Sequence, residues 1–142
     1  FLERANMKTK LFSNISPSKY NWLGTSTGII RGIGYNVAVR TNSAQAEIYI
    51  DLYYKDEAHK VNKEIFQELY SKKDAIENEF GDKLLWEELE SARASRISKI
   101  TNVGGWKSEE KWEDIHNQLI NHSIKLEKIF SSYFKKLSNK YK

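Results

Sequence analysis

The sequence contains no cysteine, and this absence excludes several classes of protein at once. A chain without cysteine has no disulfide scaffold, no thiol nucleophile and no zinc ribbon. The absence also fits a reducing compartment, so we expect a cytoplasmic protein.

Long apolar runs are missing as well. A helix needs about 20 consecutive apolar residues to span a bilayer, and no stretch of this chain approaches that length. The first residues, FLERANMKTKLF, have neither the apolar centre nor the cleavage site of a secretory signal. We therefore expect neither membrane insertion nor secretion.

The length and the first residue bear on domain organisation. A chain of 142 residues suits one domain, because about two thirds of the unfolded surface is buried at this size. We therefore predict a single domain over residues 1–142. The sequence opens on Phe1 rather than on methionine, inside a segment with a helical pattern, and we expect it to be the C-terminal part of a longer protein.

Neither sign of charge dominates the chain. The net charge of +4 and the pI near 9.1 are compatible with nucleic-acid binding without requiring it. Acidic residues prevail from Glu77 to Glu90, and a basic cluster of Arg93, Arg96 and Lys99 follows. The plain alternative is that these charges only cover the surface, as in most soluble domains.

Two stretches in the first half of the chain alternate between apolar and polar residues. They cover residues 29–41, with Tyr35, Val37 and Val39 on one face, and residues 45–54. A period of two is typical of a strand with one buried face. The polar residues 41–44 between them favour a turn, so we predict an antiparallel hairpin.

The segments around this hairpin have helical spacing. Apolar residues near the start predict an amphipathic helix that stops near Pro17, the only proline, and a loop around Tyr20 and Trp22 follows. From about Asp56 to Phe80, apolar residues predict one helix, with Gly81 as its left-handed cap.

The last third predicts a second, shorter hairpin and a long final helix. Residues 84–89 and 95–101 contain Trp86 and Ile97, which favour strands, although the leucines, glutamates and alanines here would also suit a helix. Ser108, followed by two glutamates, predicts the N-cap of a helix that runs nearly to the C-terminus. His122 lies near the apolar stripe of that helix, and we expect it to be partly buried and hydrogen-bonded.

These elements follow the order helix, two strands, helix, two strands, helix. Each amphipathic helix needs an apolar sheet face to cover, so we predict a two-layer α+β domain whose antiparallel hairpins are covered on one face by helices. A doubly wound parallel sheet is disfavoured, because too few single-helix crossovers join consecutive strands.

Several short motifs occur in a fixed order along the chain. They are WLG from Trp22, AEIYI from Ala46, NKEIFQEL from Asn62, IENEFGDKLLWEEL from Ile76 and ASRIS from Ala94. This succession resembles the prokaryotic family called domain of unknown function 4268. The resemblance implies a domain that often follows a restriction-endonuclease-like nuclease domain in bacterial and archaeal proteins. It brings no catalytic residues to this chain.

No catalytic signature is present in the sequence. The only acid-x-lysine spacing, Glu109-Glu110-Lys111, falls at a helix start, whereas a restriction-type nuclease needs it on a strand beside further carboxylates that hold Mg²⁺. The glycines Gly28, Gly32 and Gly34 precede a strand rather than a helix, so we expect a bulge or bend and not a phosphate loop. We therefore expect a noncatalytic domain without a cofactor, and any nuclease activity in an upstream domain.

Two acid-x-x-histidine spacings, Asp56 to His59 and Glu113 to His116, could place two metal ligands on one helix face. Di-iron sites of this kind also take glutamates from two further helices, while this chain spends its middle on strands. We therefore expect exposed histidines and no metal.

A binding role remains. Basic residues of the two hairpins alternate with tyrosines, and a sheet that presents cations and rings can hold phosphates and stack bases. The predicted binding residues are Arg31, Arg40, Tyr49, Arg93, Arg96 and Lys99. The expected partner is nucleic acid or the neighbouring nuclease domain. The alternative is that the tyrosines pack under helices and the arginines pair with carboxylates.

Two further classes of function stay open. A structural or homo-oligomerising domain would use the same tyrosines and arginines, since these residues concentrate affinity at protein contacts. A small-molecule or enzymatic domain would show a pocket with converging titratable groups.

Arg96 separates the two readings of the arginines. In a strand, Arg96 and Ser98 share one face while Ile97 and Lys99 share the other. If Ile97 packs inward, Arg96 points away from the core and is free to meet a partner. The rival is that Arg96 pairs with Glu87 or Glu88 of the preceding strand and serves the fold.

Overall fold

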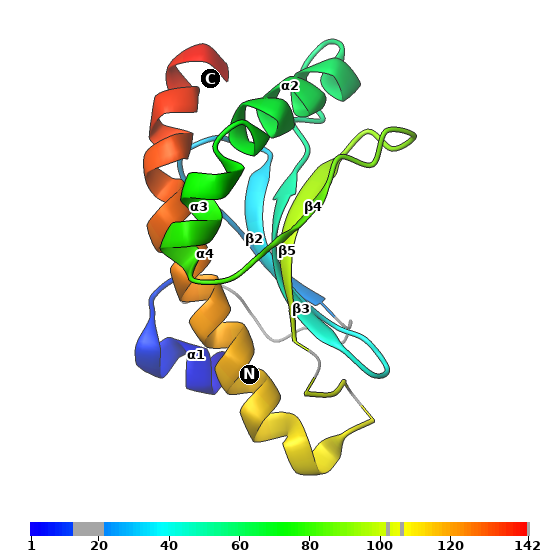
Figure 1. The fold of residues 1–142 in the computed structure, drawn as a ribbon, viewed down its shortest axis with the longest axis vertical. Coiled ribbons are helices and arrows are strands. Elements are labelled where there is room, and N and C mark those ends of the chain that lie inside the picture. Colours follow the sequence, from blue (N-terminus) through cyan, green and yellow to red (C-terminus); the bar gives the residue numbers. More distant parts are fainter. Residues whose placement is uncertain (13–21, 102, 106, 142) are drawn as a thin grey trace.

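The fold is a five-stranded sheet with helices packed on one face (Figure 1). The computed structural model describes residues 1–12, 22–101, 103–105 and 107–141. All the strand pairs are antiparallel, in the order β1-β2-β3-β5-β4. The predicted two-layer α+β class is therefore confirmed. The elements are α1 (Leu2–Lys8), β1 (Trp22–Ser26), β2 (Ile33–Val39), β3 (Ala44–Ile50), α2 (Ala58–Tyr70), α3 (Lys73–Phe80), β4 (Leu85–Glu87), β5 (Ser95–Thr101), the 3-10 turn η1 (Glu109–Lys111) and α4 (Trp112–Tyr141).

Both predicted hairpins are present. β2 and β3 pair from Ile33 opposite Ile50 to Val39 opposite Ala44, and the Arg40 N–H donates to the Ser43 carbonyl at 2.7 Å to close the turn. β4 and β5 form the second hairpin, as the β-branched residues of β5 predicted. Because β5 also pairs with β3, the two hairpins join into one continuous sheet.

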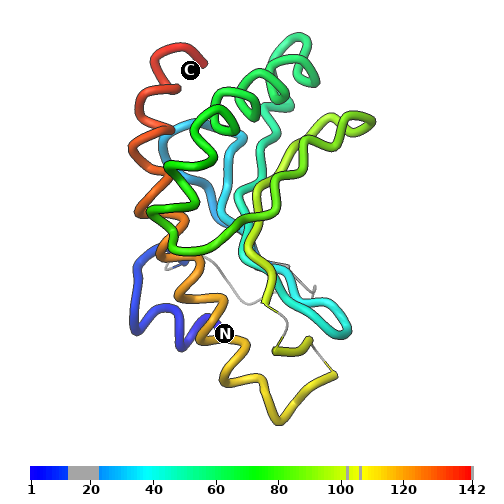
Figure 2. The backbone as a smooth tube through the Cα atoms, in the orientation of Figure 1, coloured from blue at the N-terminus to red at the C-terminus, as the bar shows by residue number. Residues whose placement is uncertain are grey.

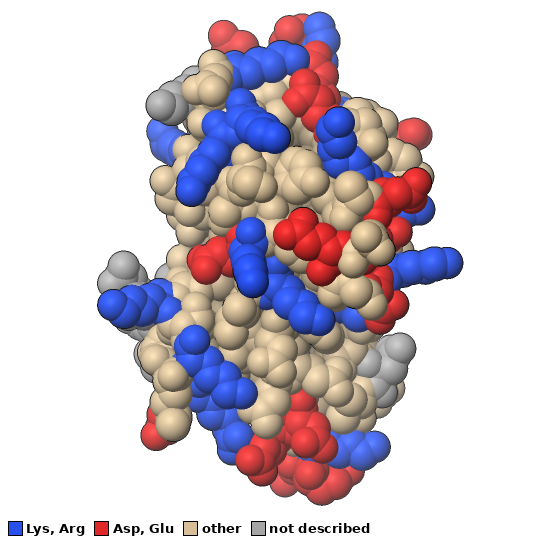
Figure 3. All heavy atoms as spheres, turned by 60° about the vertical axis from the view of Figure 1, so that its left-hand side comes forward, with Lys and Arg blue, Asp and Glu red and all other residues tan. Residues whose placement is uncertain are grey.

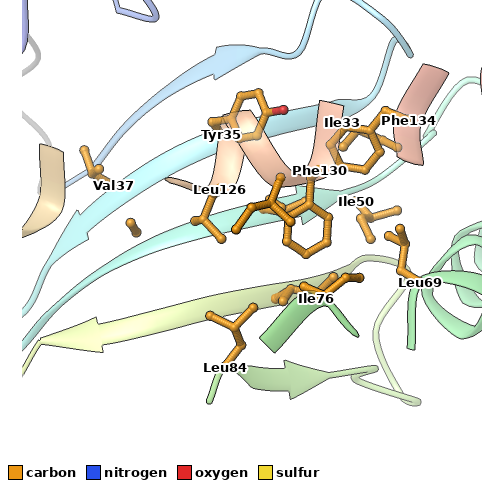
Figure 4. Close-up of a cluster of buried hydrophobic side chains, with 14 of the residues drawn as sticks. Ile33, Tyr35, Val37, Ile50, Leu69, Ile76, Leu84, Leu126, Phe130 and Phe134 are labelled. Atoms are coloured by element: carbon orange, nitrogen blue, oxygen red, sulfur yellow. The ribbon is translucent and has the colours of Figure 1, made fainter. Parts of the chain in front are cut away.

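The core lies between the sheet and α4, which runs along the whole sheet (Figure 2). Leu126, Phe130 and Phe134 of α4 face Tyr35 and Ile50 of the strands (Figure 4). The ring centroids of Tyr35 and Phe134 lie 6.3 Å apart. Burial raises the pKa of Tyr35 to about 12, which keeps its hydroxyl neutral inside the core.

The prediction of a single helix from about Asp56 to Phe80 is wrong, because the structure has two helices there, α2 and α3. The Ser71 hydroxyl donates to the Glu68 carbonyl at 2.6 Å, and the Lys72 N–H donates to the Leu69 carbonyl at 2.9 Å. The latter bond spans three residues instead of four, which tightens and ends the helix. The predicted cap at Gly81 is confirmed, with φ +91°.

Other boundaries differ from the prediction. The expected loop at Trp22 is the edge strand β1, held by its pairing with β2, while Tyr20 and Pro17 lie outside the described residues. Helix α1 ends at Lys8, with Thr9 in extended conformation. The Ser108 side chain makes no capping hydrogen bond within the described part of the chain, and η1 precedes α4.

The described helices were also searched for membrane spans. Within the ranges that the structure describes, none combines the length and the apolar character that crossing a bilayer requires.

His122 lies on α4 against α3, and its ring is tilted on the Phe80 ring at 5.9 Å. It is half-buried as predicted, but its Nδ1 has no hydrogen-bond partner among the described residues. Burial, together with the charges of the nearby Lys99 and Lys125, lowers the pKa of His122 to about 4. The folded protein therefore holds this ring neutral.

His122 should make the protein sensitive to mild acid. Between pH 6.5 and 4, His122 is protonated in the unfolded chain but stays neutral in the folded protein. The free energy of unfolding therefore falls as the pH falls through this window. Urea unfolding of His122→Leu across this range should show a flatter pH dependence than the parent. His59→Leu, at an exposed position of α2, should keep the parental slope; an unchanged slope in both variants would contradict the assignment.

Candidate nucleic-acid interface

Arg31 lies in the loop before β2, where it contacts two tyrosines that follow β3. Its guanidinium donates to the Tyr53 hydroxyl at 3.1 Å and lies 4.6 Å from the centroid of the Tyr54 ring. The Tyr54 hydroxyl donates back to the Arg31 carbonyl at 3.0 Å. A cation over an aromatic face is stabilised by the ring quadrupole, so these contacts hold the exposed arginine in a defined place.

Two backbone segments approach each other closely beneath Arg31. The Asp51 N–H donates to the Gly32 carbonyl at 2.8 Å. Gly32 has φ +96°, a left-handed conformation that glycine adopts without strain. The predicted bend at this glycine is therefore confirmed, and it brings the Arg31 loop beside the end of β3.

Arg93 lies just before β5 and reaches the same end of β3. Its Nε and Nη2 donate to the two oxygens of Asp51 at 2.8 and 2.7 Å. The hydrogen bonds and charge of Asp51 raise the pKa of Arg93. A paired guanidinium of this kind is fixed in orientation, while more than half of its side chain stays exposed.

The buried Asn62 of α2 ties these loops together. Its Oδ1 accepts from the Leu52 N–H at 2.8 Å, while its Nδ2 donates to Asp51 at 3.2 Å and to the Arg93 carbonyl at 3.0 Å. Asn62 is not among the predicted binding residues. The signal was a polar residue within an apolar helical pattern, which indicates a buried side chain with specific partners.

Tyr49 and Arg96 face each other across β3 and β5, on the sheet face away from the helices. Ile97 is fully buried, so Arg96 points outward as predicted. Arg96 Nε and Nη2 donate to Glu87 at 2.9 and 3.3 Å, and this hydrogen bonding raises the pKa of Arg96. Arg96 therefore has the carboxylate partner that the alternative interpretation predicts. Tyr49, opposite Arg96, is 37% exposed.

The two remaining predicted residues lie elsewhere. Arg40 follows β2 in the hairpin turn, at the opposite end of the sheet from Arg31. Lys99 shares the helix-covered face with Ala46, and its Nζ donates to Asp82 at 2.7 Å. The structure thus brings together four of the six predicted residues. With two further tyrosines they form what we call the arginine–tyrosine end, consisting of Arg31, Tyr49, Tyr53, Tyr54, Arg93 and Arg96.

A shallow hollow of about 300 Å³ adjoins this end, over β1 and the start of β2. Its lining includes Gly24, Ser26, Gly34 and Asn36. Gly34 lies opposite Tyr49 on one neighbouring strand and opposite Ser26 on the other. A side chain at Gly34 has no room, because its Cβ would lie 2.8 Å from the Thr25 carbonyl oxygen. The serine and asparagine supply hydrogen-bonding groups.

The described residues contain no cluster of three or more histidine, aspartate or glutamate side chains that could hold a metal ion. Glu113 pairs with Arg4 at 3.2 Å, and the His116 ring lies 5.8 Å from the Phe1 ring. Burial lowers the pKa of His116. Glu109 to Lys111 form the exposed turn η1 rather than part of a strand.

The architecture defines a small antiparallel α+β domain with a polar, aromatic-bearing sheet end. A family model described as "Domain of unknown function (DUF4268)" matches residues 1–134, and the chain belongs to this family. Neither the curated proteins nor the solved structures contain a significant match to it.

Proposed function

We propose that this domain is a noncatalytic accessory module of a prokaryotic DNA-processing protein, and that its arginine–tyrosine end contacts unpaired nucleotides. The observation that carries the proposal is the exposed Arg31 held on Tyr53 and Tyr54. The Tyr53 side chain is 54% exposed. Proteins that hold single strands combine cations for the phosphates with aromatic rings on which bases stack.

The hollow beside Tyr49 supports the same assignment. A base stacked on this ring would lie over Gly34, within reach of Ser26 and Asn36. The expected position of this domain after a restriction-endonuclease-like nuclease domain favours nucleic acid as the ligand.

The ion pairs define what each arginine contributes. Arg93 and Arg96 already neutralise Asp51 and Glu87, so their role is to position phosphate or base through the free edges of the guanidinium. Arg31 makes its contacts with tyrosines and supplies net positive charge. Because binding would release few counterions, we expect modest affinity. This affinity should fall as the salt concentration rises.

Replacing both Arg31 and Tyr53 by alanine should weaken binding of fluorescein-labelled oligothymidylate roughly tenfold, since a stacked base contributes about 1–3 kcal/mol. Fluorescence anisotropy at low salt measures the change. Arg40→Ala, which removes the same charge from the opposite end of the sheet, is the matched control and should bind like the parent.

Three outcomes would count against the proposal. The first is a parent that does not bind the oligonucleotide at low salt. The second is an Arg40→Ala variant that binds as weakly as the double variant. The third is a duplex form that binds equally well and with equal sensitivity to the substitutions. Each would show that the arginine–tyrosine end does not recognise unpaired bases.

The second candidate is a structural or oligomerisation domain, favoured by the exposure of Tyr49 and Tyr53. Exposed tyrosines beside arginines are also typical of protein contacts. Sedimentation of the domain over a range of concentrations tests this candidate, and a strict monomer would exclude self-association.

A further inference from the structure

A groove of about 270 Å³ separates the corner between α2 and α3 from the C-terminal half of α4. Leu69, Leu137 and Tyr133 give it an apolar lining, and Lys72 and Lys136 border it from different helices. The groove lies in the helical layer and includes no residue of the arginine–tyrosine end.

The lysines around this groove are not neutralised. Among the described residues, no carboxylate lies within 4.0 Å of the ammonium groups of Lys72 or Lys136, the two lysines that line the groove. Glu68, which also lines the groove, is paired with Lys140 at 3.1 Å. The groove therefore carries a net positive border.

The surface on this side of the molecule is polarised. Figure 3 shows Lys and Arg side chains over much of this face with Asp and Glu among them, and a mainly acidic lower end. The acids at the start of α4 and the lysines towards its end complement the helix dipole. Lys72 follows the C-terminal end of α2, which also favours a cation. The groove therefore receives one lysine from α4 and one from the end of a second helix.

We propose that this groove binds an acidic, amphipathic peptide segment of a partner protein. The lysines match its carboxylates, and the apolar lining accepts one or two of its apolar side chains. A peptide suits the site better than a nucleic-acid backbone, because an apolar lining offers nothing to phosphates. This binding is independent of the nucleic-acid function proposed above.

A peptide-display selection on the immobilised domain tests the proposal, with a random library as the probe. The enriched sequences should combine aspartate or glutamate with aromatic or aliphatic residues. A synthetic peptide of the enriched sequence should bind on the order of tenfold more weakly to the double variant Lys72→Glu, Lys136→Glu, as expected when charges at a rim are reversed. Both lysines are exposed, and an unchanged melting temperature would show that the variant is folded.

The matched control reverses two exposed lysines away from the groove, Lys60→Glu and Lys83→Glu, and should bind the peptide like the parent. The Arg31, Tyr53 double variant should also bind it normally, which separates this proposal from the proposed function. The absence of acidic enrichment, equal loss in the control variant, or loss of oligonucleotide binding in place of peptide binding would overturn the proposal.

Discussion

Replacing Lys63 by methionine should destabilise the domain by about 3 kcal/mol, because one ammonium group satisfies four acceptors that are at least partly buried. Its Nζ donates to the carbonyls of Glu88, Leu89 and Ala94 at 2.5, 3.0 and 2.7 Å, and to the Ser95 hydroxyl at 3.0 Å. The three carbonyls belong to the loop between β4 and β5, and Ser95 is the first residue of β5. Methionine fills a similar volume but donates no hydrogen bond, so the loop carbonyls lose their shared donor.

The measurement is the urea midpoint and slope of the variant, compared with those of Lys60→Met. Lys60 lies on the same helix but is exposed, so its substitution should change stability by less than about 0.5 kcal/mol. Equal midpoints for the two variants would show that water replaces the ammonium without loss of free energy of unfolding. Lys63 would then not stabilise the loop.

Replacing Gly32 by alanine should cost about 3 kcal/mol and weaken oligonucleotide binding together with stability. A Cβ at this position would lie 2.7 Å from the Asp51 carbonyl oxygen and 2.8 Å from the Leu52 Cα. Both are backbone atoms, which cannot move aside as a flexible side chain can. The φ of +96° adds strain for any residue with a Cβ.

Gly28→Ala separates these two contributions. Gly28 also has a positive φ, at +74°, but nothing lies within 4 Å of its would-be Cβ. Thermal unfolding should therefore show a loss of only about 1 kcal/mol, from backbone strain alone. If both variants melt at the same temperature, the close approach beneath Arg31 does not stabilise the fold.

The sheet could be predicted from local patterns because its hairpins are local. Tyr35 and Val37 alternate with polar residues, and a polar turn separates them from the equally regular β3. β1 escaped prediction because WLGTS shows no clear alternation and forms through its pairing with β2. The break at Ser71 escaped because serine and lysine are both tolerated inside helices, and the local hydrogen bonds decide the outcome.

The candidate site was predictable in composition but not in arrangement. The alternation of the strand places Lys99 and Arg96 on opposite faces, and Arg40 lies in the turn, away from both. Only the folded sheet shows that Asp51 contacts both Arg93 and the backbone of Gly32, next to Arg31. Lys63 is the clearest omission. A lysine on a helix normally faces water, and no local pattern shows that a distant loop will cover it.

The adjacent positions of Asn62 and Lys63 have a consequence for how the arginine–tyrosine end meets a ligand. One turn of α2 fixes the segment after β3 through Asn62 and the loop before β5 through Lys63. The conformational entropy of these loops is therefore lost when the domain folds and not when a ligand binds. The site is therefore preorganised, and it stays formed only while the first turns of α2 stay folded. A local unfolding of these turns would release both loops and separate Arg31, Asp51 and Arg93 from one another.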